Sequence, residues 1–204
     1  MQLLDGAVGE RLELPAYYED FRERFGRARE FWKLERGQVF AEPGSESWEA
    51  FNRGDWDESL RLIEERRAGL ADYQRRNDAR GMTSRRVRVV SLPPSPYLHW
   101  ELRLLLLRDE FGQPTRVVPA RDIAALEDQG PLPEISTLDG DVVYEVVYGD
   151  DGAADHAVRF TQPALAGRCR DLIAGLYERG EPIGEFFRRE IAPLPLPLPP
   201  PLST

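Results

Sequence analysis

The pattern of apolar and polar positions between Arg85 and Ala120 predicts a strand, a helix and a second strand. The valines of residues 87–90 form a β-branched run that is typical of a buried strand. Prolines at positions 93, 94 and 96 end that strand, because proline cannot donate a hydrogen bond to a β-ladder. Thr115–Val118 supplies the second strand after a turn at Gly112.

The segment between these strands is expected to be a helix that begins at Ser95, with Ser95 as the N-cap and Pro96 at the first helical position. Its leucines gather on one broad face, and Leu102 and Leu105 are expected among the least exposed residues of the protein. A strand, a crossover helix and a second strand form a βαβ unit, which requires parallel pairing and a covered core.

Before this unit, periodic apolar residues predict mainly helices. Aromatic residues in Ala16–Leu34 recur at roughly helical spacing. A short strand at Gln38–Phe40, a short helix after Ser45 and a long amphipathic helix at Asp57–Ala79 are expected to follow.

After the unit, the pattern predicts a hairpin between two helical regions. Val142–Tyr148 and His156–Phe160 flank an Asp-Asp-Gly turn, which favours an antiparallel pair. The remaining expected elements are a short helix at Arg121–Leu126, a strand at Ile135–Leu138, a helix from Pro163 to Gly180 and a helical stretch at Pro182–Ile191.

These elements predict an α/β fold: a mixed sheet with a βαβ core, a C-terminal antiparallel hairpin and flanking helices. Residues 1–15 are expected to be a loosely ordered lead-in. Residues 16–192 then form a single domain, with a helical part at 16–80 and the βαβ, hairpin and helix part at 85–192. The alternating Leu and Pro residues of 193–204 predict a flexible, polyproline-like tail.

The charge of the chain restricts its partners. Its 204 residues carry a net charge of −9, which argues against binding a nucleic acid backbone or an anionic membrane by bulk charge. The sequence has no apolar run near the roughly 20 residues that span a bilayer and no signal-peptide pattern at its start. A cytoplasmic location is therefore expected.

Single residues limit the chemistry further. Cys169 is the one cysteine, so no internal disulfide is expected, and its place on an apolar helix face predicts a core residue. Lys33 is the one lysine, so a Schiff-base lysine would have to be Lys33. His99 and His156 lack the spacing of metal ligands, and the aspartates of 139–155 do not fit a calcium loop. No catalytic residue, metal or cofactor is predicted.

The candidate ligand site lies at the ends of the two parallel strands, where open α/β sheets bind ligands. His99 and Glu101 pair an imidazole with a carboxylate, although positions i and i+2 of a helix face different ways. Arg88 and Arg116 are expected to converge on a phosphate or carboxylate. Ion pairing of the arginines with Glu101, Glu145 or Asp122 is the structural alternative. The candidate set is Arg88, Tyr97, His99, Glu101, Arg116 and Arg121.

Several motifs resemble an actinobacterial domain-of-unknown-function family, family 6879. They are the RRVRVV strand, the PYLHWEL helix start, the RVVPA strand, VVYEVVYGDDG and RFTQP, with FWKLER upstream. The resemblance covers about Tyr17 to Ala192 and implies no catalytic residue. Because members often occur beside helix-turn-helix regulators, it implies a role in transcriptional control or signalling.

The element order is also similar to half of a phospholipase D-type domain. That family's motif needs a lysine two residues after a histidine. Neither His99 nor His156 is followed by a lysine at that spacing, so the motif is absent. Any similarity to that family would therefore be one of fold alone.

Two functional hypotheses remain open. The first is a non-enzymatic regulatory or adaptor protein that acts through a protein partner, such as a helix-turn-helix regulator. The second is a small-molecule- or nucleotide-binding enzyme with a site near Arg88, Tyr97, His99 and Arg116. A homodimer is compatible with either. A pocket with convergent polar groups would favour the second, and a filled cleft with an exposed apolar patch would favour the first.

Overall fold

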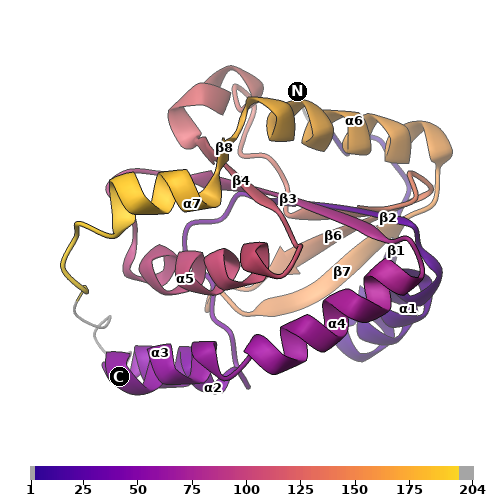
Figure 1. Cartoon of the computed structure of the whole chain (residues 1–204). Coiled ribbons are helices and arrows are strands. Elements are labelled where there is room, and N and C mark those ends of the chain that lie inside the picture. The colour runs from indigo at the N-terminus through magenta and orange to yellow at the C-terminus, as the bar shows by residue number, and fades with distance from the viewer. Residues whose placement is uncertain (1–2, 198–204) are drawn as a thin grey trace.

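A computed structural model describes residues 3–197, which fold around one mixed β-sheet (Figure 1). Its strand order is β1-β7-β6-β5-β2-β3-β4-β8. Strands β2, β3 and β4 pair in parallel, and the other neighbours pair antiparallel. The strands are β1 Glu10–Glu13, β2 Glu30–Glu35, β3 Thr83–Val90, β4 Thr115–Pro119, β5 Ile135–Leu138, β6 Val142–Tyr148, β7 Ala154–Phe160 and β8 Glu181–Pro182.

Helices cover both faces of this sheet. Figure 1 shows α6 on one face, and α1, α4 and α5 on the other. The α-helices are α1 Leu14–Arg27, α2 Glu46–Asn52, α3 Trp56–Glu64, α4 Arg67–Ala79, α5 Pro96–Glu110, α6 Pro163–Arg179 and α7 Ile183–Phe186. A 3-10 helix spans Ala120–Leu126, and a π-helical turn spans Phe187–Ile191. The predicted α/β class, βαβ core and C-terminal hairpin are confirmed.

The core lies in two layers, one on each side of the sheet. Under α6, Cys169 and Ile173 pack against Trp32, Leu34 and Val87. On the opposite side, α5 begins at Ser95, whose hydroxyl accepts a hydrogen bond from the Leu98 amide at 3.1 Å. Its apolar face is enclosed as predicted: Leu102 is 0% exposed and Leu105 is 2% exposed.

The predicted helix at Ala16–Leu34 is wrong beyond Arg27. Residues 30–35 instead form β2, the strand that joins the parallel and antiparallel parts of the sheet. Trp32 and Leu34 face α6, while Phe31 belongs to the cluster under α1. Because apolar residues lie on both faces of β2, the alternation that marks a half-exposed strand is missing.

Three other expectations are corrected. Gln38–Phe40 forms no strand, and Glu10–Glu13, part of the expected lead-in, is an edge strand paired with β7. The predicted helix at Asp57–Ala79 is divided into α3 and α4. Leu60 of α3 and Leu70 of α4 pack against the same cluster. The apolar pattern therefore continues across the break between the two helices and does not reveal it.

The predicted tail at 193–204 falls partly outside the described residues. Residues 193–197 form neither helix nor strand. They pass α3, where the Trp56 indole Nε1 donates a hydrogen bond to the Pro197 carbonyl at 2.8 Å.

Candidate functional site

The parallel strands place a row of charged side chains on the sheet face opposite α6. In the strand register Lys33 lies beside Arg86, and Glu35 lies beside Arg88. Two cations side by side on neighbouring strands repel each other. Glu35 offsets this repulsion, because its carboxylate forms ion pairs with both Lys33 (2.6 Å) and Arg86. These attractions outweigh the effect of burial and lower the Glu35 pKa.

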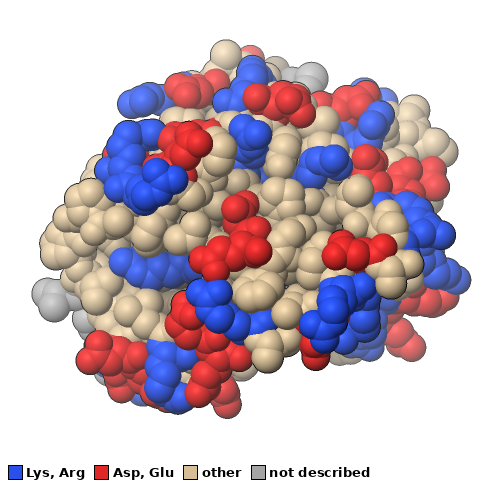
Figure 2. Space-filling view, viewed as in Figure 1, with Lys and Arg blue, Asp and Glu red and all other residues tan. Residues whose placement is uncertain are grey.

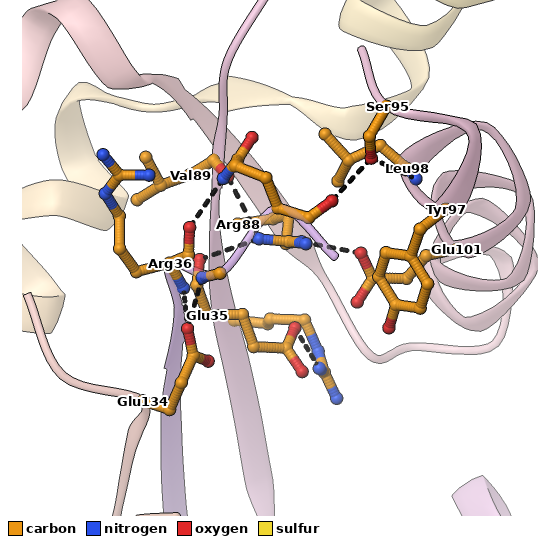
Figure 3. Close-up of polar contacts among 12 residues, drawn as sticks. Glu35, Arg36, Arg88, Val89, Ser95, Tyr97, Leu98, Glu101 and Glu134 are labelled. Atoms are coloured by element: carbon orange, nitrogen blue, oxygen red, sulfur yellow. Dashed lines mark hydrogen bonds and ion pairs between the residues drawn. The ribbon is translucent and has the colours of Figure 1, made fainter. Parts of the chain in front are cut away.

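A fully buried arginine anchors this row to α5 (Figure 3). The Arg88 Nε donates to the Glu101 carboxylate at 2.7 Å, and its Nη1 donates to the Glu35 and Val89 carbonyls at 3.3 and 3.1 Å. Arg88 is 0% exposed and Glu101 is 5% exposed. Burial raises the Glu101 pKa, against the opposing attraction of Arg88. This pair joins β3 to α5. Arg88 is therefore engaged in an ion pair within the protein, which was the alternative to ligand binding.

The structure unites only part of the predicted ligand set. Tyr97 lies near the Arg88–Glu101 pair and donates to Glu42 at 2.9 Å. His99 is buried one helical turn from Arg103, and burial followed by that positive charge lowers its pKa.

The expected convergence of Arg88 and Arg116 does not occur. Arg116 bonds to the Gly180 carbonyl at 2.9 Å, and its guanidinium lies 5.3 Å from the ring centre of Tyr177 in α6, on the opposite face of the sheet. Neighbouring strand positions alternate between faces, and Arg88 pairs in register with Val117 rather than Arg116. Arg121 is exposed beside Asp122.

A cavity of about 750 Å³, called the cleft below, lies between α1, α4, the end of α5 and the sheet. Its basic side chains outnumber its acidic ones six to one, in a chain whose net charge is −9. The acid is Glu134, and the basic residues are Arg22, Lys33, Arg76, Arg80, Arg86 and Arg108. Aromatic side chains form much of the remaining wall, among them Tyr17, Phe21, Phe25, Phe31, Tyr73 and Tyr148.

Polar atoms on this wall lack partners within the described residues. They include the Asn77 Nδ2 on α4, the Arg108 Nε on α5 and the Gln113 Nε2 in the following turn. Arg108 also forms no ion pair with the described part of the chain. Burial, reinforced by the charge of Arg86, lowers the Arg108 pKa to about 10, so the side chain remains cationic at neutral pH.

Glu134 contributes a carboxylate of a different kind. Its Oε1 accepts hydrogen bonds from the backbone amides of Arg36 (2.6 Å) and Gly37, and its Oε2 has no hydrogen-bond partner among the described residues. Burial is the main cause that raises its pKa to about 7, and the negative charge of Glu35 adds to the effect.

A smaller cavity of about 350 Å³ adjoins the cleft. Lys33, Arg86 and Arg108 line both cavities, so these three cations stand where they meet. The smaller cavity also contacts Glu101, which connects it to the buried Arg88 pair. The region thus combines a network of paired ions with an adjoining cationic and aromatic cleft.

Comparison with protein families matches residues 19–188 to the family described as "Domain of unknown function (DUF6879)". The chain belongs to this family. The resemblance inferred from the sequence motifs is therefore confirmed at the level of the family. No curated protein matches the chain.

Sixteen chains of solved structures match. One belongs to the work titled "Structure of TrmBL2, an archaeal chromatin protein, shows a novel mode of DNA binding". It shares 10% identity with a TM-score of 0.42, and the match covers 85% of the present chain and 52% of that chain. The DUF6879 chain thus matches about half the length of that archaeal protein, and a likeness this weak supports no functional argument.

In residues 3–197, no group of three or more His, Cys, Asp or Glu residues is placed to hold a metal ion. Within the same range, no helix has both the length and the apolar character needed to cross a bilayer.

Proposed function

We propose that this DUF6879 domain is a non-enzymatic regulatory module that binds a small molecule in the cleft between α1, α4 and α5. The observation that carries the proposal is the cavity of about 750 Å³, in which aromatic and cationic side chains converge. Its volume lies in the range of small-molecule sites, roughly 300–1,000 Å³. Convergent polar groups in a pocket are the feature expected of the second hypothesis, the small-molecule- or nucleotide-binding enzyme. The proposal takes the ligand site from that hypothesis and the regulatory role from the first.

The distribution of charge supports a small ligand over a nucleic acid. Acidic and basic side chains are intermingled on the face of the molecule shown in Figure 2. The excess of basic over acidic residues in the cleft therefore contrasts with the acidic balance of the whole chain. A polyanion would meet the mixed outer surface, whereas a small molecule reaches the cationic interior.

Helix α1 is the part of the cleft best suited to respond to a ligand. None of its residues is buried, although Phe21 and Phe25 make edge contacts with the Phe31 ring of β2. A ligand between α1 and the sheet would add contacts that this helix lacks. We propose that ligand binding orders α1 and thereby changes the affinity for a protein partner, for which a helix-turn-helix regulator is the candidate.

Two glycines offer a matched test of the site. Gly26 of α1 lines the cleft, and Gly167 of α6 lies on the opposite side of the sheet. A Cβ atom at either position meets nothing within 4 Å, so both helices accept a side chain there. Gly26→Trp is expected to occupy the cleft, whereas Gly167→Trp leaves it open.

The probe is N-phenyl-1-naphthylamine, a neutral dye whose fluorescence rises in apolar sites. We expect saturable one-to-one binding by the native chain and by Gly167→Trp, and loss of binding by Gly26→Trp. Equal binding by both variants would place the dye elsewhere and refute the site. Hydrogen exchange with and without dye tests the regulatory part, since the amides of α1 should become more protected on binding. Unchanged exchange in α1 would contradict that part alone.

A further inference from the structure

Building on the proposed ligand site, we infer that its ligand is an aromatic anion. The geometry assigns an acidic group, such as a carboxylate or phosphate, to the open donors of Asn77 and Arg108. It assigns a planar ring to the aromatic wall formed by α1 and α4.

Asn77 lines the cleft, and its amide oxygen is already engaged. The Oδ1 accepts hydrogen bonds from Arg80 Nε at 3.3 Å and Nη2 at 2.9 Å. Two donors to the same atom identify it as the oxygen and leave the Nδ2 as the free end. Asn77 is 4% exposed, so the described residues leave a buried donor unsatisfied.

Arg108 differs from the other cations between the two cavities. Lys33 and Arg86 are both paired with Glu35, whereas the side chain of Arg108 makes no hydrogen bond or ion pair with the described residues. Arg108 is half-buried and its Nε is enclosed, so water does not fully solvate its charge, and an anion beside it offsets that cost. Arg108 and Asn77 come from α5 and α4, and both line the same cavity.

The aromatic wall offers ring faces for the other end of the ligand. Phe21 and Phe25 stack with their ring centres 5.5 Å apart, and Phe25 stacks with Tyr73 of α4 at 6.2 Å. Planar rings prefer offset-stacked or edge-to-face contacts with such groups. A purely apolar ligand would use this wall but leave the Asn77 and Arg108 donors open, and a small inorganic anion would leave the wall unused.

The test compares two dyes with related ring systems. 8-Anilinonaphthalene-1-sulfonate carries an acidic group, and N-phenyl-1-naphthylamine lacks it. Both are titrated against the native chain, Arg108→Gln and the control Arg75→Gln. Arg75 is an exposed residue of α4 that is paired with Asp72. Circular dichroism verifies that each variant is folded.

We expect the native chain to bind the sulfonate at least tenfold more tightly than the neutral dye. Arg108→Gln should weaken sulfonate binding by about tenfold or more, the usual effect of losing one charge-assisted hydrogen bond. Binding of the neutral dye should change less than twofold, and Arg75→Gln should alter neither dye. Arg108→Lys, which keeps the charge, should recover part of the sulfonate affinity.

The failures of the two proposals are distinguishable. Equal native affinities for the two dyes, or equal losses of both in Arg108→Gln, would overturn the anion assignment while the cleft remains a binding site. If neither dye binds the native chain, or Gly26→Trp does not block binding, the ligand site itself is refuted and the anion assignment falls with it.

Discussion

Two arginines near the same face of the sheet have opposite surroundings. Arg88 of β3 donates to one carboxylate and two carbonyls, and only its Nη2 lacks a partner among the described residues. Arg108 of α5 lines two cavities, and its side chain has no hydrogen-bond or ion-pair partner in that part of the chain. The contrast indicates that burial of a charge does not by itself identify a binding residue. Open donors beside a cavity are the more informative sign.

Two carboxylates repeat the contrast. Glu35 is paired with Lys33 and Arg86, and these cations hold its pKa below the usual range. Glu134 has two backbone amides as donors and one oxygen without a hydrogen-bond partner among the described residues, and burial raises its pKa to about 7. The molecule thus has a network of paired ions joined to a cleft in which Arg108 and Glu134 lack ion-pair partners among the described residues.

The largest effect is expected when the network of paired ions is broken. Arg88→Met leaves Glu101 buried without its main partner, and such a loss costs about 3–5 kcal/mol of stability. Urea denaturation monitored by tryptophan fluorescence measures the change. In the double variant Arg88→Met with Glu101→Gln, no buried carboxylate is left behind, so the loss should be smaller than in Arg88→Met alone. If Arg88→Met is as stable as the native chain, the structural role assigned to Arg88 is wrong.

Truncation of a core leucine provides a second measure of how strongly the fold depends on α5. Leu102→Ala on the enclosed face of α5 should lower the free energy of unfolding by about 2–5 kcal/mol, through lost burial and a new cavity. The half-buried Leu106 of the same helix is the control, and its replacement by alanine should cost less. Equal costs at the two positions, measured by the same denaturation, would contradict the assigned core face.

Sequence patterns predicted the elements that carry a clear local signal. The valines of β3, the leucines of α5 and the Asp-Gly turn of the hairpin each gave an unambiguous local signal. Strand β2 gave none, because Phe31 and Trp32 pack on opposite faces and both are buried. A strand with two buried faces resembles a piece of apolar helix when it directly follows one.

The cleft is harder to predict than the ion network. Pairing of the arginines with Glu101 or Asp122 was an alternative available from the sequence, and the Arg88–Glu101 and Arg121–Asp122 pairs both form. The cleft instead unites side chains from Tyr17 to Tyr148, and which of their donors stay open depends on the tertiary arrangement. The signal that was missed is the interleaving of aromatic and basic residues along 17–33, which indicated only an amphipathic helix.

Glu134 predicts how stability depends on pH. Its folded pKa of about 7 exceeds the unfolded value of roughly 4.3, so between these pH values the folded state holds the extra proton. Stability therefore falls as pH rises through this window, by at most about 4 kcal/mol. The groups that set this pKa are the Arg36 and Gly37 amides, Glu35 and Arg88.

Glu134→Gln isolates this contribution. The glutamine oxygen can still accept from the Arg36 and Gly37 amides, while the titrating group is gone. Denaturation curves collected from pH 5 to pH 8 should show a shallower decline for the variant than for the native chain. If stability declines equally with pH in the variant and the native chain, the pKa of Glu134 is not raised by folding. The contrast between Glu134 and Glu35 would then be wrong.

The smallest expected effect is also the one most specific to the cleft. Because the side chain of Arg108 has no hydrogen-bond or ion-pair partner among the described residues, Arg108→Gln removes a half-buried, poorly solvated charge without breaking a hydrogen bond or ion pair in that part of the chain. The free energy of unfolding should therefore rise, by about 1 kcal/mol, opposite in sign to the effect of Arg88→Met. A residue retained for ligand binding is expected to show this combination of better stability and weaker anion binding. Loss of stability in Arg108→Gln would instead show that Arg108 supports the fold in the same way as Arg88, and the difference between the two arginines would disappear.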